Sequence, residues 1–414
     1  MSHALDIPDL REHLLTRVLP FWARHSIDPD HGGFITHLGR DGTITDRSHK
    51  FLVMQTRMIY SFVAGAALGG PAEWVSIARQ GVEFLLRQFR DIQYDGWFWS
   101  VSRQGRPGES GKRMYGHAFA IYALAEYARH IGDSHVLAAA NHTWSLVAEY
   151  LWDREHEGVM EACNRAWSPT DRSHTMGTHL HTLEALLALN EAVGGNRFLS
   201  HARKVADLIG NRMLDTKHRC GVEYFLSDWA PDDERNRARS PFGRPKELPV
   251  GAVGADGWLV NYGHNLEAAW LLLRMYRLEG TPGYRDVARS FLDYVIEFGL
   301  DATHGGVYSH GPLGGAATVR EKIWWVQCEA LPAFLLARIV FGDDRYLDAF
   351  RNVARFCLDY LHDPEHGEWY HSTEEDGTPR DRTKGSAWKA AYHVTQAIAY
   401  SDSYLLELGL SPAG

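Results

Sequence analysis

Two hydrophobic patterns alternate along this chain of 414 residues. In segments 82–89 and 353–361, apolar residues recur three and four positions apart, so each predicted helix has one apolar and one polar face. The segments that begin at Tyr115, His181 and Asn265 are apolar on nearly every side, which is typical of helices packed against neighbours all round. The alternation therefore predicts pairs of helices, one half-exposed and one buried.

A short motif separates the helices of each pair and repeats along the chain. It consists of an aspartate, a short polar stretch, a glycine and then usually an aromatic residue or valine. The motif starts at Asp28, Asp91, Asp153, Asp215, Asp301 and Asp363, at intervals of 63, 62, 62, 86 and 62 residues. Four intervals agree within one residue and the remaining one is about 24 residues longer, so the repeat predicts six units with a single insertion.

The simplest arrangement of six such pairs is a closed double ring. An open array of repeats needs polar capping units at its ends, whereas the first and last units here resemble the others. We therefore expect an all-α fold, an (α/α)6 barrel of six inner and six outer helices, in which residues 1–414 form one domain. Short β-hairpins are expected at the glycine turns, as in segments 96–101, 306–310 and 367–372.

The extra residues of the fourth unit lie in segment 227–260, which is rich in proline, glycine and arginine. A long loop beside a binding pocket often acts as a lid, and Arg244 and Lys246 are its candidate lid residues. The alternative is a passive surface excursion, which the sequence leaves open.

Composition narrows the class of partner. The net charge of −9 is spread along the chain, which argues against a nucleic-acid partner. No window approaches the ~18 uncharged apolar residues of a membrane helix, and the N-terminal segment lacks a basic stretch followed by an apolar core. The four cysteines are far apart in sequence. We expect a cytoplasmic protein with buried free thiols, although pairing of some cysteines stays open.

Histidine and tryptophan are abundant, with 23 and 14 copies, which suits proton transfer on a small polar ligand. Six polar residues fall 25 to 30 positions after the motif aspartates, once the insertion is removed: Arg57, His117, His181, His264, Glu329 and His393. Buried polar groups cost free energy unless they are satisfied or face a wet pocket. We therefore expect these six to converge on one mouth of the ring, against the alternative that each is a satisfied core residue.

Signatures of metal and phosphate sites are missing from the sequence. There is no HExxH motif, and His179 and His181 would point in different directions on a helix. No phosphate-binding GxxxxGK[ST] loop occurs either. We expect neither a metal nor another cofactor.

Several motifs together resemble the N-acylglucosamine 2-epimerase superfamily. They are RMIYSF from Arg57, CNRAW from Cys163, THLHTLEA from Thr178, GHNLEAAWLLL from Gly263, WWVQCEAL from Trp324 and AWKAAYH ending at His393. The superfamily includes cellobiose 2-epimerases, mannose 2-epimerases, mannose isomerases and sulfoquinovose isomerases. The resemblance covers essentially the whole chain and implies the same barrel.

The resemblance also implies a site. Its catalytic positions match Arg57, His181, His264, Glu267 and His393, and its sugar-contacting positions resemble Trp325, Glu329 and Trp388. We also expect Tyr115, His117 and Asn164 to contact the substrate. The implied reaction moves the proton at C2 of a free sugar through a cis-enediolate. His264 and His393 would be the acid–base pair, His181 would assist ring opening, Arg57 would stabilise the enediolate, and Glu267 would orient an imidazole. A histidine base and an arginine counter-charge suit that chemistry.

Several functions remain open at this point. We expect a 2-epimerase of a free aldose such as mannose or glucose, acting as a monomer or homodimer. An aldose–ketose isomerase, a cellobiose 2-epimerase and an N-acylglucosamine 2-epimerase are the alternatives within the family. Outside it stand an (α/α)6 glycoside hydrolase, which would need two carboxylates flanking the pocket, and a non-catalytic sugar-binding protein.

Overall fold

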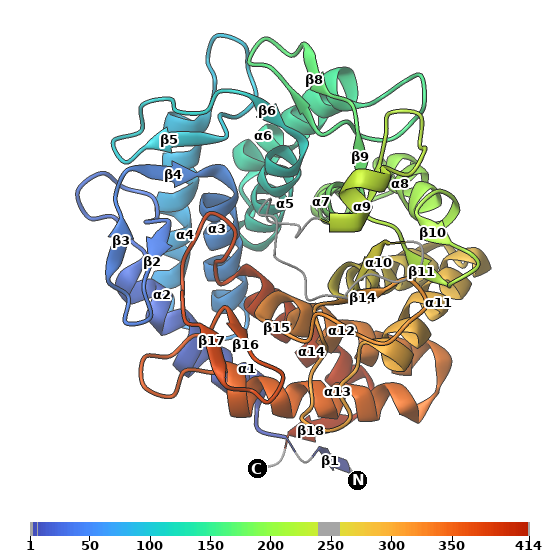
Figure 1. The fold of residues 1–414 in the computed structure, drawn as a ribbon. Coiled ribbons are helices and arrows are strands. Elements are labelled where there is room, and N and C mark those ends of the chain that lie inside the picture. Colours follow the sequence, from blue (N-terminus) through green and yellow to red (C-terminus); the bar gives the residue numbers. More distant parts are fainter. Residues whose placement is uncertain (1–2, 6, 239–256, 413–414) are drawn as a thin grey trace.

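The inner ring consists of six nearly parallel helices, seen along the barrel axis in Figure 1. The computed structural model describes residues 3–5, 7–238 and 257–412. The inner helices are α3 (Leu52–Ala67), α5 (Met114–Ile131), α7 (Met176–Val193), α10 (Tyr262–Glu279), α12 (Trp324–Phe341) and α14 (Tyr392–Glu407). Their first turns and middles are buried almost completely, with Tyr115 and His264 partly exposed, as their all-round apolar patterns predict.

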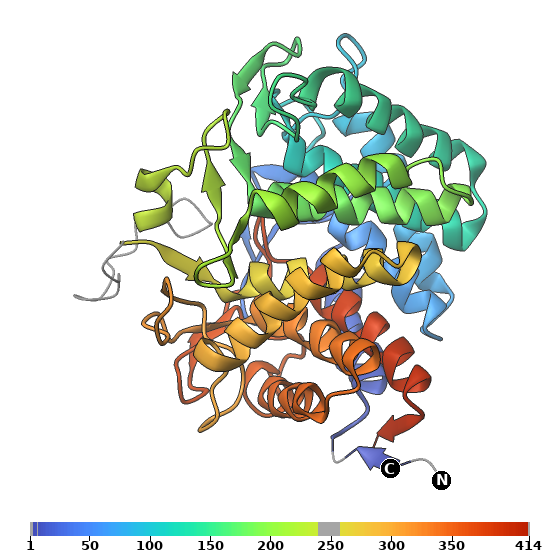
Figure 2. The same ribbon diagram turned by 90° about the vertical axis from the view of Figure 1, so that its right-hand side faces the viewer.

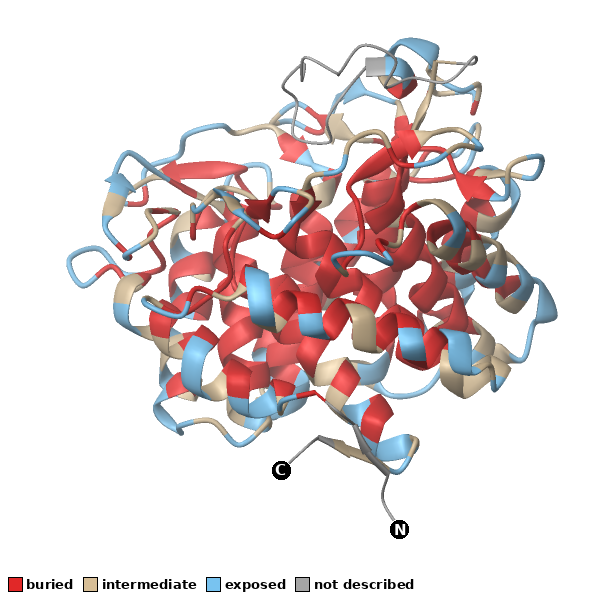
Figure 3. Cartoon of the chain, turned by 60° about the horizontal axis from the view of Figure 1, so that its bottom comes forward, coloured by how far each residue is buried: buried red, intermediate tan, exposed pale blue. Residues whose placement is uncertain are grey.

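The outer ring consists of the amphipathic helices, which Figure 3 shows with one buried and one exposed side. They are α4 (Glu73–Phe84), α6 (Ser134–Leu146), α8 (Leu199–Asn211), α11 (Pro282–Phe298) and α13 (Asp344–Phe356). The π-helical turns η2 (Leu85–Phe89), η3 (Val147–Leu151) and η4 (Cys357–Leu361) extend α4, α6 and α13. The predicted (α/α)6 barrel is confirmed.

The N-terminal segment completes the outer ring. Helix α1 (Leu10–His13), η1 (Leu14–Val18) and α2 (Leu19–His25) form one continuous outer helix, and α1 and η1 pack on α14. Strand β1 (His3–Leu5) pairs in parallel with β18 (Leu410–Pro412). The two ends of the chain are thereby joined at the end of the barrel opposite the other strands (Figure 2).

Short antiparallel strands collect at the other end of the barrel, just ahead of the inner helices (Figure 2). Most of them pair between successive repeats, so they tie neighbours together as well as forming local hairpins. The pairings are β2 (His37–Leu38) with β3 (Ile44–Asp46), β4 (His49–Phe51) with β5 (Ser100–Ser102), β6 (Lys112–Arg113) with β7 (Ala162–Cys163) and β7 with β8 (Pro169–Asp171), β9 (His174–Thr175) with β12 (Tyr224–Phe225), β10 (Leu214–Asp215) with β11 (Cys220–Gly221), β13 (Leu259–Asn261) with β14 (His310–Pro312), β15 (Lys322–Ile323) with β16 (Ser372–Thr373), and β16 with β17 (Pro379–Asp381).

The repeated aspartate is a buried ion-pair partner. Asp28 accepts hydrogen bonds from two turn amides, and it also pairs with Lys50, which lies just before α3, and with Arg103 of the next repeat. The same contacts recur at Asp91 with Lys112 and Arg165. Asp301 and Asp363 pair with the buried lysines Lys322 and Lys384, whereas Asp153 pairs with the half-exposed Arg172 and Asp215 contacts His218. Asp28 and Asp91 therefore each fix their own turn, the start of the following inner helix and the adjoining repeat.

The ring closes through the same device. Arg40 in the first repeat donates two hydrogen bonds to Asp363 in the last, at 2.8 and 3.0 Å, and Lys384 Nζ lies 3.3 Å from the same carboxylate. Burial alone would raise the pKa of Asp363, but the hydrogen bonds from Arg40 and the charge of Lys384 lower it well below its usual range. Asp363 therefore stays ionised and paired in the folded protein.

Three other expectations concern the fold. The four cysteines are buried free thiols. Of the described helices, α12 has the length and apolarity to cross a membrane, but it is a mostly buried member of the inner ring. Within the predicted lid 227–260, helix α9 (Asp233–Ala238) lies beside the central opening (Figure 1). Arg244 and Lys246 lie outside the described residues.

Asp363→Asn should destabilise the protein because it removes the negative charge that pairs with the fully buried Lys384 and with Arg40 across the ring closure. Removing one partner of a buried ion pair costs about 3–5 kcal/mol, so thermal unfolding should shift down by several degrees. Asp359→Asn makes the same chemical change at an exposed position of η4 and should leave the melting temperature within about a degree of the wild type. Equal melting temperatures for the two variants would contradict the structural role of Asp363.

Candidate active site

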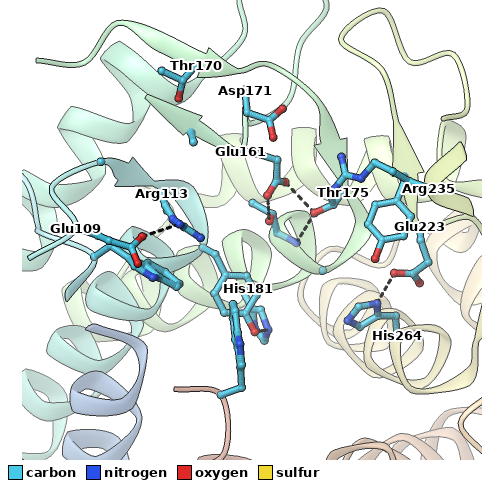
Figure 4. A pocket seen from close by; sticks show the side chains of 18 of the residues that line it. Glu109, Arg113, Glu161, Thr170, Asp171, Thr175, His181, Glu223, Arg235 and His264 are labelled. Carbon is cyan, nitrogen blue, oxygen red and sulfur yellow. Dashed lines mark hydrogen bonds and ion pairs between the residues drawn. The ribbon is translucent and has the colours of Figure 1, made fainter. Parts of the chain in front are cut away.

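A cavity of about 680 Å3 opens at the strand-bearing end of the barrel. Its wall is made by the first two turns of the inner helices and by the strands and loops that precede them (Figure 4). Its size suits a small-molecule ligand. The lining side chains that the sequence singles out are Arg57, Tyr115, Asn164, His181, His264, Glu267, Trp325, Trp388 and His393.

His264, in the first turn of α10, is held by Glu223. Its Nδ1 lies 2.6 Å from Glu223 Oε2 (Figure 4). Asn261 caps the helix, because its side-chain oxygen accepts hydrogen bonds from the amides of Gly263 and His264. With Nδ1 donating to the carboxylate, the other ring nitrogen is left bare on the side of the cavity.

His393, in the first turn of α14, has a similar arrangement with Glu329. Its Nδ1 lies 2.8 Å from Glu329 Oε1, while Glu329 Oε2 accepts a hydrogen bond from the indole of Trp270. Burial raises the pKa of Glu329 to about 8. Burial and the charge of Arg57 lower the pKa of His393 well below its usual value, so this imidazole is neutral at physiological pH.

The expectation that Glu329 touches the sugar is not met by its position. Its carboxylate lies behind His393 and is absent from the described cavity wall. Both carboxylate oxygens are used inside the protein, so Glu329 acts on His393.

His181, in the second turn of α7, contacts two carboxyl groups. Its Nδ1 lies 3.2 Å from Glu184 and 3.4 Å from Glu267, and its Nε2 lies 3.0 Å from the hydroxyl of Tyr115. Burial lowers the pKa of His181 to about 4 despite the hydrogen bond with Glu184. Burial and the charge of Glu329 raise the pKa of Glu267. Glu267 therefore approaches an imidazole, as predicted, but that imidazole belongs to the neighbouring helix.

Arg57 brings a buried positive charge to the site from α3. Its guanidinium donates to the Tyr115 hydroxyl at 3.0 Å and to the backbone carbonyl of Trp388, and it lies 4.4 Å from the centre of the Phe119 ring. Its Nε has no hydrogen-bond partner among the described residues. The charge is thus fixed beside the cavity by contacts that leave it unneutralised.

A hydrogen-bonded bridge supports the floor of the cavity. Glu184 on α7 accepts hydrogen bonds from the hydroxyl of Tyr392, at 2.6 and 2.7 Å, and from the side-chain amide of Gln396. Helices α7 and α14 are the third and sixth inner helices, so the bridge crosses the barrel. It locks Glu184 in the position that meets His181.

The prediction that His117 converges on the cavity is wrong. His117 is fully buried, with Nδ1 hydrogen-bonded to the carbonyl of Arg113 and Nε2 accepting from the amide of Trp97. It is the fourth residue of α5, whereas Arg57 and His181 are the sixth residues of α3 and α7. Two residues turn a side chain to a different part of the helix surface, here toward the preceding glycine turn.

The fourth position has the same structural role in other repeats. His179, Gln55 and Gln327 each accept a hydrogen bond from a backbone amide of the preceding glycine turn. Burial lowers the pKa of both His117, to about 4, and His179, to about 3. These two histidines are therefore neutral parts of the scaffold.

The remaining predicted contacts lie on the cavity wall. The ring of Trp325 lies 5.1 Å from that of His264 and 6.0 Å from that of His393. Trp388 packs edge-on against Tyr115, with the ring centres 5.4 Å apart. Asn164 lies at the rim, where its side-chain oxygen accepts two backbone hydrogen bonds within the loop between β7 and β8, so only its amide group is left for a ligand.

Three carboxylates near the site were missed in the sequence: Glu161, Glu184 and Glu223. Glu184 had a signal, because the spacing His181-x-x-Glu184 repeats the spacing His264-x-x-Glu267. Glu223 lies 41 residues before its partner in a strand-bearing segment, so no local pattern connects the two.

One cluster outside the cavity has metal-ligand atoms close together. Asp301, His304 and Glu375 place one such atom each within 4.8 Å of one another. Lys322 reaches into this cluster, with Nζ 2.8 Å from Asp301 and 2.6 Å from the carbonyl of Glu375. The lysine ammonium therefore supplies the positive charge there, as it does at Asp28, Asp91 and Asp363.

Comparisons with known proteins identify the family. Residues 33–397 match the family described as N-acylglucosamine 2-epimerase (GlcNAc 2-epimerase). The chain is 27% identical to the cellobiose 2-epimerase of Bacteroides fragilis, covering 93% of this chain and 95% of that protein. It is 26% identical to the D-mannose isomerase of Marinomonas mediterranea, covering 95% and 96%. It is also 28% identical to the N-acylglucosamine 2-epimerase of Mus musculus, covering 95% and 90%.

Solved structures agree with this assignment. The cellobiose 2-epimerase of Spirochaeta thermophila has a TM-score of 0.84 at 30% identity, with 96% of each chain covered. A D-mannose isomerase has a TM-score of 0.85 at 24% identity, covering 95% of this chain and 97% of that one. A family 76 glycoside hydrolase has a TM-score of 0.67 at 12% identity, covering 96% of this chain and 77% of that one. At these identities the last two structures show a shared fold alone. Because the family match extends over most of the chain, this protein belongs to the N-acylglucosamine 2-epimerase family and is a sugar epimerase or isomerase.

Proposed function

We propose that this enzyme is a 2-epimerase of a free aldose of the mannose/glucose type. The observation that carries the proposal is the pair of imidazoles, His264 and His393, on the wall of one cavity and beside the same indole, Trp325. Each imidazole has its Nδ1 committed to a carboxyl group, Glu223 or Glu329. Two oriented imidazoles can remove a proton from one face of C2 and return one to the other face. A single base with rotation of the C1–C2 unit is the alternative.

The two imidazoles differ in which ring nitrogen carries the proton. His264 donates its Nδ1 proton to Glu223, so its Nε2 is a free base that can take the proton from C2. Glu329, with its pKa raised to about 8 by burial, is mostly protonated at neutral pH and donates to His393 Nδ1. His393 then carries its proton on Nε2. As it returns this proton to the substrate, its Nδ1 takes the proton of Glu329, so the imidazole stays neutral and Glu329 becomes a carboxylate.

The neighbouring groups serve the other steps. Removal of the C2 proton leaves a cis-enediolate, whose oxygen charge is stabilised by the nearby guanidinium of Arg57. His181, linked to the hydroxyl of Tyr115 at 3.0 Å, assists ring opening at the C1 oxygen, and Glu267 supports His181. The indoles of Trp325 and Trp388 offer flat apolar faces to the C–H surfaces of the sugar.

Return of the proton to C1 instead of C2 would give a ketose with the same residues. The aldose–ketose isomerase is therefore the second candidate, and the 26% identity to a D-mannose isomerase supports it. The similarity to cellobiose 2-epimerases and N-acylglucosamine 2-epimerases keeps cellobiose and N-acetylmannosamine as test substrates.

The reaction is tested by incubating the protein with D-mannose in D2O and following the sugar by proton NMR. Glucose labelled with deuterium at C2 is the expected product, because an imidazole that has exchanged with solvent returns the proton. If fructose is formed instead, the enzyme is an aldose–ketose isomerase. If mannose, cellobiose and N-acetylmannosamine all fail to exchange, the catalytic roles of His264 and His393 are wrong.

Substitution of two histidines by glutamine should separate chemistry from scaffold. His181→Gln should lower kcat/KM for the active sugar by about 10²–10⁴-fold, the usual contribution of an acid–base group. His117→Gln should retain activity within a few fold, because Gln55 and Gln327 already make the same backbone hydrogen bond in their repeats. Both variants should unfold near the wild-type temperature. A comparable loss of activity in both variants would show that His117 also contributes to the reaction.

Gly177 leaves room for His264, and adding a methyl group there should slow the reaction. A Cβ at position 177 would lie 3.1 Å from Cε1 and 3.2 Å from Nε2 of His264, which must shift by tenths of an ångström. We expect Gly177→Ala to lower kcat about 10- to 100-fold, while the loss of a helical glycine holds or raises the melting temperature. Gly283→Ala, on α11 with no atom within 4 Å, is the control and should keep full activity. Unchanged turnover in Gly177→Ala would contradict the role of His264.

A further inference from the structure

Glu161 occupies the place of Glu223 in the preceding repeat. The amide of Met114, which begins α5, donates to the carbonyl of Glu161, and the amide of Met176, which begins α7, donates to the carbonyl of Glu223. The side-chain partners match too. Glu161 contacts Thr178, the third residue of α7, whereas Glu223 contacts His264, the third residue of α10.

The surroundings of Glu161 leave its carboxylate open to the cavity. One oxygen accepts from the hydroxyl of Thr175 at 2.8 Å and the other from the hydroxyl of Thr178 at 3.0 Å (Figure 4). No lysine, arginine or histidine pairs with it among the described residues. The cation Arg235, whose charge acts on Glu161, donates to Ser173 Oγ and lies over the ring of Tyr224 at 4.4 Å.

The part of the cavity wall formed by Glu161 therefore still has free hydrogen-bond acceptor positions. A carboxylate has about four acceptor positions, and the two threonines use two of those on Glu161. A second acceptor on the same wall is also unused, because Glu223 Oε1 is buried without a hydrogen-bond partner in the described part of the chain. Neighbouring hydroxyl groups of a sugar are donors that fit such a wall.

Glu161 is suited to binding rather than to proton transfer from carbon. At the equivalent position of the two repeats, Glu161 contacts the hydroxyl of Thr178, whereas Glu223 contacts the imidazole of His264. The acid–base pair is already complete in His264 and His393. A carboxylate held by two hydroxyls beside that pair is a fixed acceptor for the part of the ligand that does not react.

We propose that Glu161 is a specificity-determining residue, which accepts hydrogen bonds from sugar hydroxyls remote from C1 and C2. This inference rests on the proposed function, because it takes a free aldose as the ligand. It makes the enzyme selective for polyhydroxylated, uncharged sugars over their deoxy derivatives, since a missing hydroxyl leaves the carboxylate unpaired in a buried place.

The test compares Glu161→Gln with the wild type on D-mannose and on 3-, 4- and 6-deoxy-D-mannose. Binding is measured by the fluorescence of the cavity tryptophans, Trp325 and Trp388, and turnover by proton NMR. Glu83→Gln, which makes the same chemical change at an exposed position of the outer helix α4, is the matched control. We expect Glu161→Gln to raise Kd and KM for mannose about 10- to 100-fold, with kcat within about threefold, and Glu83→Gln to leave all three nearly unchanged.

The deoxy sugars distinguish a direct contact from a structural effect. At the hydroxyl that Glu161 binds, deoxygenation should weaken binding to the wild type about 10- to 100-fold and to Glu161→Gln less than about threefold. The proposal for Glu161 would be overturned if the two proteins bound mannose equally well. It would also be overturned if removal of each hydroxyl weakened binding equally in the two proteins. In either case, turnover of mannose would still support the proposed function. Binding of mannose without turnover would reject the proposed function alone, and no binding by the wild type would reject both.

Discussion

The buried aspartates that pair with a buried lysine, at four of the six glycine turns, are the constraint on which the rest of the barrel depends. Asp28 and Asp91 each pair with a lysine two residues before an inner helix and with an arginine of the next repeat, and Arg40 extends the same linkage from the first repeat to the last. Because the pairs hold the starting points of the inner helices at one level, the first two turns of those helices meet around one opening. The position of the active site follows from this ring of ion pairs.

Inside the opening, a second set of charge pairs prepares the chemistry. The three imidazoles on the wall come from α7, α10 and α14, and each has its Nδ1 beside a glutamate: Glu184, Glu223 or Glu329. Burial lowers the pKa of His181 and His393, so these two stay neutral. The glutamates then decide which ring nitrogen carries the proton, a choice that free imidazole leaves open. The scaffold thus fixes orientation and tautomer before a sugar arrives.

The helices and the ring were predictable because they depend on short periods. An apolar stripe or an all-round apolar helix is visible within a dozen residues, and six such pairs recur at regular intervals. Counting from the aspartates also placed Arg57, His181, His264 and His393 at the cavity, whereas Glu267, Trp325 and Trp388 were expected from the family resemblance alone. The assignment of His117 to the cavity failed because of an error of only a few residues. Counting from the aspartates tolerates an error of a few residues, whereas two residues on a helix turn a side chain from the cavity to the scaffold. Glu223 was out of reach because a 41-residue separation leaves its pairing with His264 to tertiary structure.

The near-symmetry of the barrel also explains how unlike groups come to surround one ligand. The carbonyls of Trp99, Glu161, Glu223, Ser309 and His371 each receive the amide of the first residue of an inner helix, so these five residues occupy equivalent places. A regular ring therefore offers several positions of equal height, and the side chain at each is free to differ because the backbone carries the structural contact. Glu223 supports an imidazole, Glu161 faces the cavity with two threonines, and Trp99 adds an aromatic surface. A sugar is itself asymmetric around its ring. The equivalent positions of the barrel carry different side chains, so the hydroxyls, the apolar faces and the reacting carbon of the sugar can each contact a different group.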